Sequence, residues 1–219
     1  MAFLAMWVGI LWMTMVEGGQ CSMVGLPPID RDMYKESHPI TYQITSLGHK
    51  GDNLNRYLMG RQFMVIFINF TIGLAGAPLE DAEVFGLPDW LTAIFLGSGI
   101  AMVLTNVNIG QLTSQCNASH CMLDYINNHF MTFTLWVTLA IEFTGVMHVC
   151  YVIRDCFYWG SGKPVESNEP PKAGFTLFFY WIRVLFSVCV LGFAIAVTIA
   201  AIFQDKTAVW DGVPPIASV

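Results

Sequence analysis

The sequence predicts an all-α, polytopic integral membrane protein with about five transmembrane helices. Of its 219 residues, 55% are hydrophobic and only 12% are charged, whereas soluble domains carry about 25% charged residues. Five apolar stretches approach or exceed the ~20 residues that a helix needs to cross a hydrocarbon core of about 30 Å. Helices are expected because unpaired backbone groups facing lipid cost several kcal/mol each, and the stretches lack the alternation of barrel strands.

We expect one transmembrane domain over residues 1–219. The predicted spans cover residues 1–20, 58–77, 90–110, 130–153 and 175–203, with long loops at 27–57 and 154–174. In the second span the purely apolar part, 63–77, is short, so this helix either begins earlier, near Leu58, or is partly re-entrant.

The first apolar stretch begins at residue 1 without a basic flank. A signal peptide needs a basic region before its apolar stretch and a small-residue cleavage site, and neither precedes Glu17. We therefore expect the chain to be a piece of a longer protein. The formal net charge is −6 and there is no basic stripe, so a nucleic-acid partner is not expected.

The distribution of Lys and Arg only partly defines the orientation. Segment 27–61 carries five basic residues and segment 78–89 carries none, which favours a cytoplasmic first loop. Continued alternation would place 111–129, which has no Lys or Arg, inside and the more basic 154–174 outside. Glycosylation at the Asn117-Ala118-Ser119 sequon would also need the opposite side, so its use is left open.

Two short motifs place glutamines at the mouths of the first two spans. Glu17-Gly18-Gly19-Gln20 ends the first span and Gly60-Arg61-Gln62 begins the second. Helical spacing puts Gln62 and Asn69 on one stripe of the second span, and Glu17 and Gln20 on one face of the first. The repeated pattern predicts a solute site shared by two helices, although small and polar residues in spans usually serve helix packing.

A carboxylate lies deep in the fourth predicted span. Glu142 is about 12 residues from Arg154 and shares a helical stripe with Thr138. A lone ionised carboxylate there would cost several kcal/mol. Arg183 in the fifth span lies within about 5 Å of the same depth, so we predict a Glu142–Arg183 ion pair. Such a pair would either take part in the protein's activity or simply hold the two helices together.

No enzymatic or metal-binding pattern is evident. The segment from Cys116 to His129 offers Cys, His and Asp side chains, but their spacing matches no common zinc motif, and no metal site is expected. A membrane enzyme would use Glu142, His148 and Cys150, yet on one continuous helix residues 142 and 148 point to different faces. We therefore expect a non-enzyme without a cofactor.

Three motifs in order resemble the diatom silicon transporters: Glu17-Gly18-Gly19-Gln20, Gly60-Arg61-Gln62 within 57–63, and Cys121-Met122-Leu123-Asp124. The resemblance covers essentially the whole chain. It implies one half of a ten-helix, inverted-repeat-like transporter, spans two to six, with a missing second half of the same chain as partner. It also implies sodium-coupled uptake of silicic acid across the plasma membrane, and possible use in intracellular vesicle membranes, with the Gly-x-Gln motifs binding the substrate.

Orthosilicic acid fits such a site because it is small, neutral and tetrahedral, with hydroxyls that both donate and accept hydrogen bonds. We expect Gln20, Gln62 and Asn69 to supply amides, and the glycines to permit backbone approach and a broken helix. Glu17 with unwound carbonyls would hold sodium, and Arg61 would order the Glu17 carboxylate. The expected substrate-binding set is Glu17, Gly18, Gly19, Gln20, Gly60, Arg61, Gln62 and Asn69.

Two other classes of protein share these features. One is a transporter or channel for another small neutral solute, such as a polyol or boric acid, or for a cation. The other is a non-transporting, multi-span structural protein in which the polar residues only pack helices.

Overall fold

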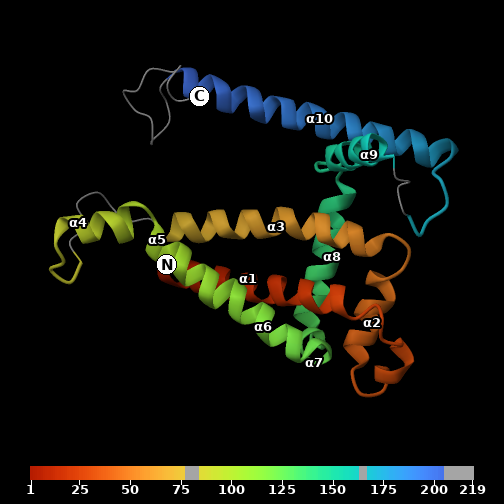
Figure 1. Ribbon diagram of the computed structural model, residues 1–219, viewed down its shortest axis with the longest axis horizontal. Coiled ribbons are helices and arrows are strands. Elements are labelled where there is room, and N and C mark those ends of the chain that lie inside the picture. Colours follow the sequence, from red (N-terminus) through yellow and green to blue (C-terminus); the bar gives the residue numbers. More distant parts are fainter. Residues whose placement is uncertain (77–83, 163–166, 205–219) are drawn as a thin grey trace. The chain divides into compact units, whose positions relative to one another are not determined.

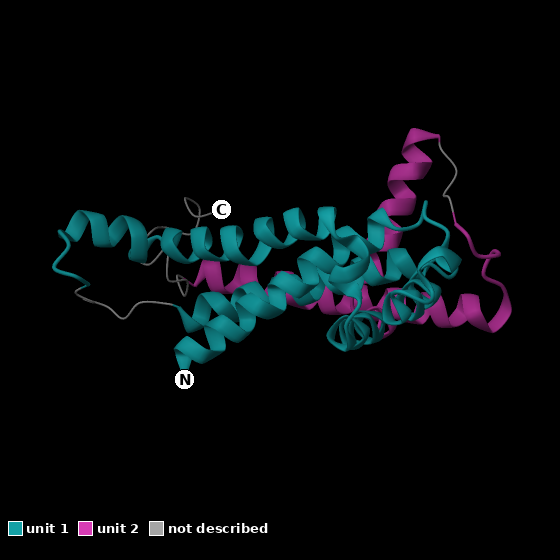
Figure 2. Ribbon diagram, turned by 90° about the horizontal axis from the view of Figure 1, so that it is seen from below, with its two compact units in different colours: residues 1–141 teal, residues 142–219 magenta. Residues whose placement is uncertain are grey.

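The computed structural model describes residues 1–76, 84–162 and 167–204, and every regular element in these ranges is helical. The chain forms two compact units, Met1–Ile141 and Glu142–Val219 (Figure 2). The helical character predicted from composition is therefore present throughout the described ranges.

The first unit contains two long helices and several shorter ones (Figure 1). Helix α1 spans Ala2–Gly25 and α3 spans Asn53–Ala75. The remaining elements are the 3-10 turn η1 (Arg31–Tyr34), α2 (Pro39–Gly48), α4 (Asp89–Thr92), the π-helical η2 (Ala93–Gly97), α5 (Ile100–Thr105), the π-helical η3 (Asn106–Leu112), α6 (Thr113–His120), α7 (Met122–Ile126) and most of α8 (His129–Phe143).

The second unit begins at the last two residues of α8. It continues with α9 (Val149–Ser161) and the long apolar α10 (Gly174–Phe203).

Helix α1 is the centre of the first unit, because it packs against both α3 and α6 (Figure 1). Its buried apolar side chains recur at helical spacing and meet those of α3. This first cluster consists of Ile10, Met13, Val16, Met64, Val65, Ile68 and Ile72. A second cluster joins the end of α1 to α2, α7 and α8 through Met23, Leu26, Ile44, Tyr57, Ile126, Met131 and Leu135.

Helix α8 runs across α1 and α3 rather than along them (Figure 1). The crossing is close because Gly60 of α3 lies directly against the backbone of Thr138, leaving no room for a Cβ atom. At the other end of α8, Phe130 and Phe133 contact the indole ring of Trp12. Small residues allow such close backbone approach between helices.

Within the described residues, three helices are long and apolar enough to span a membrane: α1, α3 and α10. A fourth span is possible by length and composition if the bent pair Asp89–Gly97 and Ile100–His120, which meet at 52°, counts as one. The predicted span 90–110 therefore differs from the structure. It is interrupted near Gly99, whose φ of 74° lies in the left-handed region, and its helix continues to His120.

The predicted fourth span, 130–153, is not one helix. Helix α8 ends at Phe143 and α9 begins at Val149, with Gly145 at φ 85° between them. Glycine adopts this left-handed conformation without the steric penalty of a Cβ atom. The sequence did not reveal the break because a single glycine in an apolar stretch also suits helix packing.

The expected loops also contain helices. Segment 27–57 includes η1 and α2, and α3 begins at Asn53, so the second span is one long helix that begins earlier than Leu58. Helix α9 extends to Ser161, within the expected loop 154–174. Residue 77, the last of the second predicted span, and residues 78–83 of the following segment lie outside the described residues.

Gly60→Ala should destabilise the protein, because the added methyl group would meet the Thr138 carbonyl and push α3 away from α8. Overpacking of this kind costs about 1–3 kcal/mol. Gly73→Ala on the same helix is the matched control, since no atom lies within 4 Å of the position that its methyl group would occupy. Thermal unfolding in detergent should show a lower Tm for Gly60→Ala only. Equal Tm values for the two variants would contradict this packing.

Candidate functional site

A buried ion pair joins the two motifs. Nη1 of Arg61 on α3 lies 3.3 Å from Oε1 of Glu17 on α1, and the two side chains are only 7% and 8% exposed. Burying either charge alone would cost several kcal/mol, and each charge offsets the burial cost of the other. The expectation that Arg61 orders the Glu17 carboxylate corresponds to this contact.

Two glutamines extend the pair. Nε2 of Gln115, on α6, donates a hydrogen bond of 3.0 Å to the second carboxylate oxygen of Glu17. Nη2 of Arg61 donates one of 3.1 Å to Oε1 of Gln62. The carboxylate is thus held from two helices. Gln115 was not predicted as a site residue, because it lies in a polar stretch that carries no recognisable motif.

Apart from Nη1 of Arg61, which faces Glu17, two buried polar atoms beside the ion pair have no hydrogen-bond partner among the described residues. They are the hydroxyl of Tyr57, a fully buried residue one helical turn before Arg61, and Nε of Arg61 itself. A methyl group added at Gly19 would lie 3.5 Å from the Tyr57 hydroxyl, so this hydroxyl adjoins the first motif. Buried polar groups are normally paired. These atoms therefore retain unused capacity for hydrogen bonds.

The glycines of the first motif allow close packing. Helix α1 continues without interruption through Gly18 and Gly19 to Gly25, so the broken helix expected here is absent. The ring of Tyr125 fills the space beside Gly18, and its hydroxyl donates a 2.7 Å hydrogen bond to the carbonyl of Thr14. Burial raises the pKa of Tyr125 to about 12, which keeps this donor protonated at neutral pH.

The two motif glutamines differ in burial. Gln20 is half-buried and Gln62 is exposed, and no hydrogen bond between described residues joins them. The reason is the rotation of α3: Arg61 and Ile68 face the core of the first unit. Successive helical residues differ by about 100°, which turns Gln62 and Ile66 outward. A solute site lined by the amides of both Gln20 and Gln62 therefore stays a prediction.

Asn69 lies deeper on α3 and is half-buried. Its side-chain oxygen accepts a hydrogen bond from Nδ2 of Asn106 on η3. Asn69 therefore connects α3 to the bent fourth segment, and it does not share a contact with Gln62.

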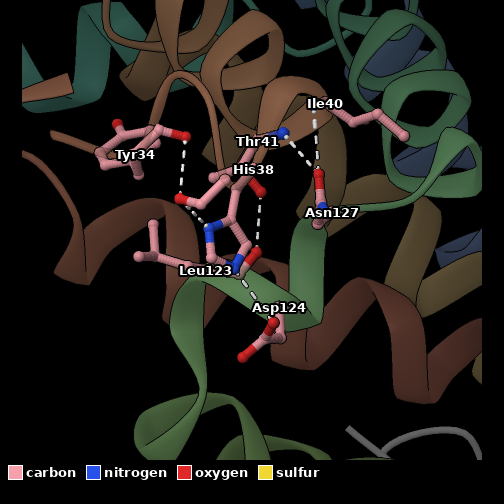
Figure 3. Close-up of polar contacts among 8 residues, drawn as sticks. Tyr34, His38, Ile40, Thr41, Leu123, Asp124 and Asn127 are labelled. Carbon is pink, nitrogen blue, oxygen red and sulfur yellow. Dashed lines mark hydrogen bonds and ion pairs between the residues drawn. The ribbon is translucent and has the colours of Figure 1, made fainter. Parts of the chain in front are cut away.

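The third motif docks onto the start of α2 (Figure 3). Asp124 pairs with His38, with Oδ1 and Nε2 3.0 Å apart, while the carbonyl of Leu123 accepts a 2.7 Å bond from the Thr41 hydroxyl. Oδ1 of Asn127 accepts from the backbone amides of Ile40 and Thr41. These amides are unpaired at a helix N-terminus, so Asn127 caps α2 from a distant part of the sequence.

The two charged residues predicted to pair in the second unit have other partners. Oε1 of Glu142 accepts a 3.0 Å hydrogen bond from the Tyr151 hydroxyl and lies 3.7 Å from Nε2 of His148. The guanidinium of Arg183 lies over the rings of Phe143 and Phe179, at 5.4 and 5.0 Å. Among the described residues no ion pair joins Glu142 to Arg183.

These features define a multi-span membrane protein with buried charges held between its helices. A family model described as silicon transporter matches residues 1–219. The chain belongs to the silicon transporter family, which confirms the resemblance seen in the sequence. Comparison with curated proteins and with solved structures gave no match.

The Glu17–Arg61 pair should behave as a strongly coupled unit. Removing one partner by Glu17→Gln or Arg61→Met leaves an uncompensated buried charge and should cost about 3–5 kcal/mol. The double variant should lose much less than the sum of the two single variants.

The matched control is the exposed Arg154–Asp155 pair, 36% and 46% exposed, whose disruption should cost at most about 1 kcal/mol. Chemical denaturation of the four proteins of the cycle measures the coupling. Strictly additive losses for Glu17 and Arg61 would show that the two side chains do not interact.

Proposed function

We propose that this protein carries orthosilicic acid into the cell together with sodium, across the plasma membrane, and that the region around Glu17 and Arg61 binds both. The family match supports silicic acid as the substrate. The buried ion pair that joins the two motifs between α1 and α3 is the observation that supports this location for the binding site.

The chemistry of the solute suits this region. Orthosilicic acid is uncharged at neutral pH, and its four hydroxyls donate and accept hydrogen bonds. The unpartnered Tyr57 hydroxyl can do both, and Nε of Arg61 can donate. Gln20 is half-buried three residues after Glu17 on α1, and its amide also offers a donor and an acceptor. We propose these three side chains as the solute contacts.

Sodium would bind at the carboxylate. It is a hard cation that prefers oxygen ligands, and Glu17 offers two carboxylate oxygens. Those oxygens are now held by Arg61 and Gln115. Sodium at Glu17 would weaken the ion pair between Glu17 and Arg61, and the Arg61 guanidinium would then turn toward the solute. Coupling follows, because each bound species makes the site more favourable for the other.

Gln62 would act through Arg61, because its side-chain oxygen accepts a hydrogen bond from Arg61 Nη2. It would therefore orient the guanidinium and need not touch the solute. Substitution of Gln62 should then be milder than substitution of Gln20.

Silicic acid uptake into proteoliposomes, with and without a sodium gradient, tests this proposal. Glu17→Gln should abolish the stimulation by sodium. Tyr57→Phe should keep sodium dependence and raise KM about five-fold, as expected for one lost hydrogen bond of ~1 kcal/mol. Gln20→Ala should also raise KM.

Tyr34→Phe is the matched control, because Tyr34 is equally buried but its hydroxyl pairs with Thr45. Its uptake should equal that of the wild type. Full sodium stimulation in Glu17→Gln, or faster uptake of boric acid or a polyol than of silicic acid, would contradict the proposal.

A further inference from the structure

The helix break between α8 and α9 is stabilised by specific contacts within the second unit. Ser187 on α10 is fully buried, and its hydroxyl donates a 2.6 Å hydrogen bond to the carbonyl of Val146 and accepts a 3.0 Å bond from the amide of Val149. These backbone groups would otherwise be unpaired where the helix is interrupted. The side chain of Arg183 packs directly against Gly145, where a Cβ atom would not fit.

The break brings together two ionisable side chains that the sequence separates. On one continuous helix Glu142 and His148 would point to different faces, because six residues turn the helix by about 600°. In the structure, Oε1 of Glu142 lies 3.7 Å from Nε2 of His148. The two side chains are 8% and 2% exposed. The expectation that these two side chains point to different faces was wrong, because it assumed an unbroken helix.

Two tyrosine rings pack against His148. The ring of His148 lies edge-on to Tyr151, with centroids 5.2 Å apart, and 5.8 Å from the ring of Tyr180. The Tyr151 hydroxyl donates to the same Glu142 oxygen that faces His148. The surroundings therefore screen the pair poorly, and the interaction between its charges is stronger than it would be in water.

Three further charged groups belong to the neighbouring helices. The guanidinium of Arg183, on α10, lies over two phenylalanine rings and forms no ion pair with Glu142. On α9, Arg154 and Asp155 pair with each other. Glu142, with Oε1 3.7 Å from Nε2, is a charged group that lies directly against the His148 imidazole. The positive charge of Arg183 opposes protonation of His148, whereas the negative charge of Glu142 favours it.

We propose that Glu142 and His148 form a proton-binding site, built by the break between α8 and α9. A proton bound at Nε2 converts the 3.7 Å approach into an ion pair with a charge-assisted hydrogen bond. Forming that bond requires the two groups to move closer by several tenths of an ångström. Proton binding thus draws the first turn of α9 toward the end of α8. Because Glu142 and His148 interact strongly, they titrate as a coupled pair, and the bound proton is assigned to the pair and not to one residue.

This site is separate from the Glu17–Arg61 region in residues and in chemistry. The two regions belong to different units of the chain. Failure of the solute-binding proposal would leave the proton site standing, and the reverse also holds.

Histidine-selective isotope labelling and NMR of the protein in lipid nanodiscs test the proposal. The chain has five histidines, so the resonance absent in His148→Gln identifies His148. If that variant does not fold, substitution of the other four histidines in turn identifies the resonance by elimination. The proposal predicts that the His148 resonance changes with pH as the imidazole gains a proton.

Glu142→Gln supplies the decisive comparison. Removing the carboxylate removes the charge that favours the imidazolium, so the His148 titration midpoint should fall by about one pH unit or more. His120→Gln, which alters an exposed histidine, should leave that midpoint unchanged. A His148 resonance that does not titrate, or a midpoint unmoved by Glu142→Gln, would overturn the proposal and leave the pair a structural contact only.

Discussion

The first unit depends on the ion pair between Glu17 and Arg61. In a chain with only 12% charged residues, each buried charge must find compensation, because transfer of an isolated ion into an apolar medium costs several kcal/mol. Here the two charges come from different helices, so they are compensated only when α1 and α3 meet in one register. The ion pair therefore adds little net stability to the fold. Its main effect is to favour one arrangement of two otherwise apolar helices over others.

The glycines of the motifs make this pairing possible. Gly18 and Gly19 lie against Tyr125 and Met131, and Gly60 lies against the Thr138 backbone. Larger residues at these positions would separate α1 and α3 from the crossing helices. The same residues that mark the motifs therefore serve packing as well as the site. This dual role explains why polar chemistry and small residues occur together at the ends of apolar helices.

Composition was enough to predict a helical membrane protein, and the motifs were enough to predict its family. Helical spacing placed Glu17 and Gln20 on one face of the first span, but it did not show which face of α3 is buried, so Gln62 was expected to point inward. Gln115 and the break at Gly145 were missed for a related reason. Both depend on contacts between segments that lie far apart in the sequence, such as the hydrogen bonds of Ser187, and local patterns carry no signal for them.

The central claim is that silicic acid binds beside the Glu17–Arg61 pair. The most direct test is the change in Tm that silicic acid causes in the wild type and in the Glu17→Gln/Arg61→Met double variant, at a fixed sodium concentration. A ligand that binds only the folded state raises Tm. The account predicts a rise in the wild type and none in the double variant. An equal rise in both proteins, or no rise in the wild type, would contradict it.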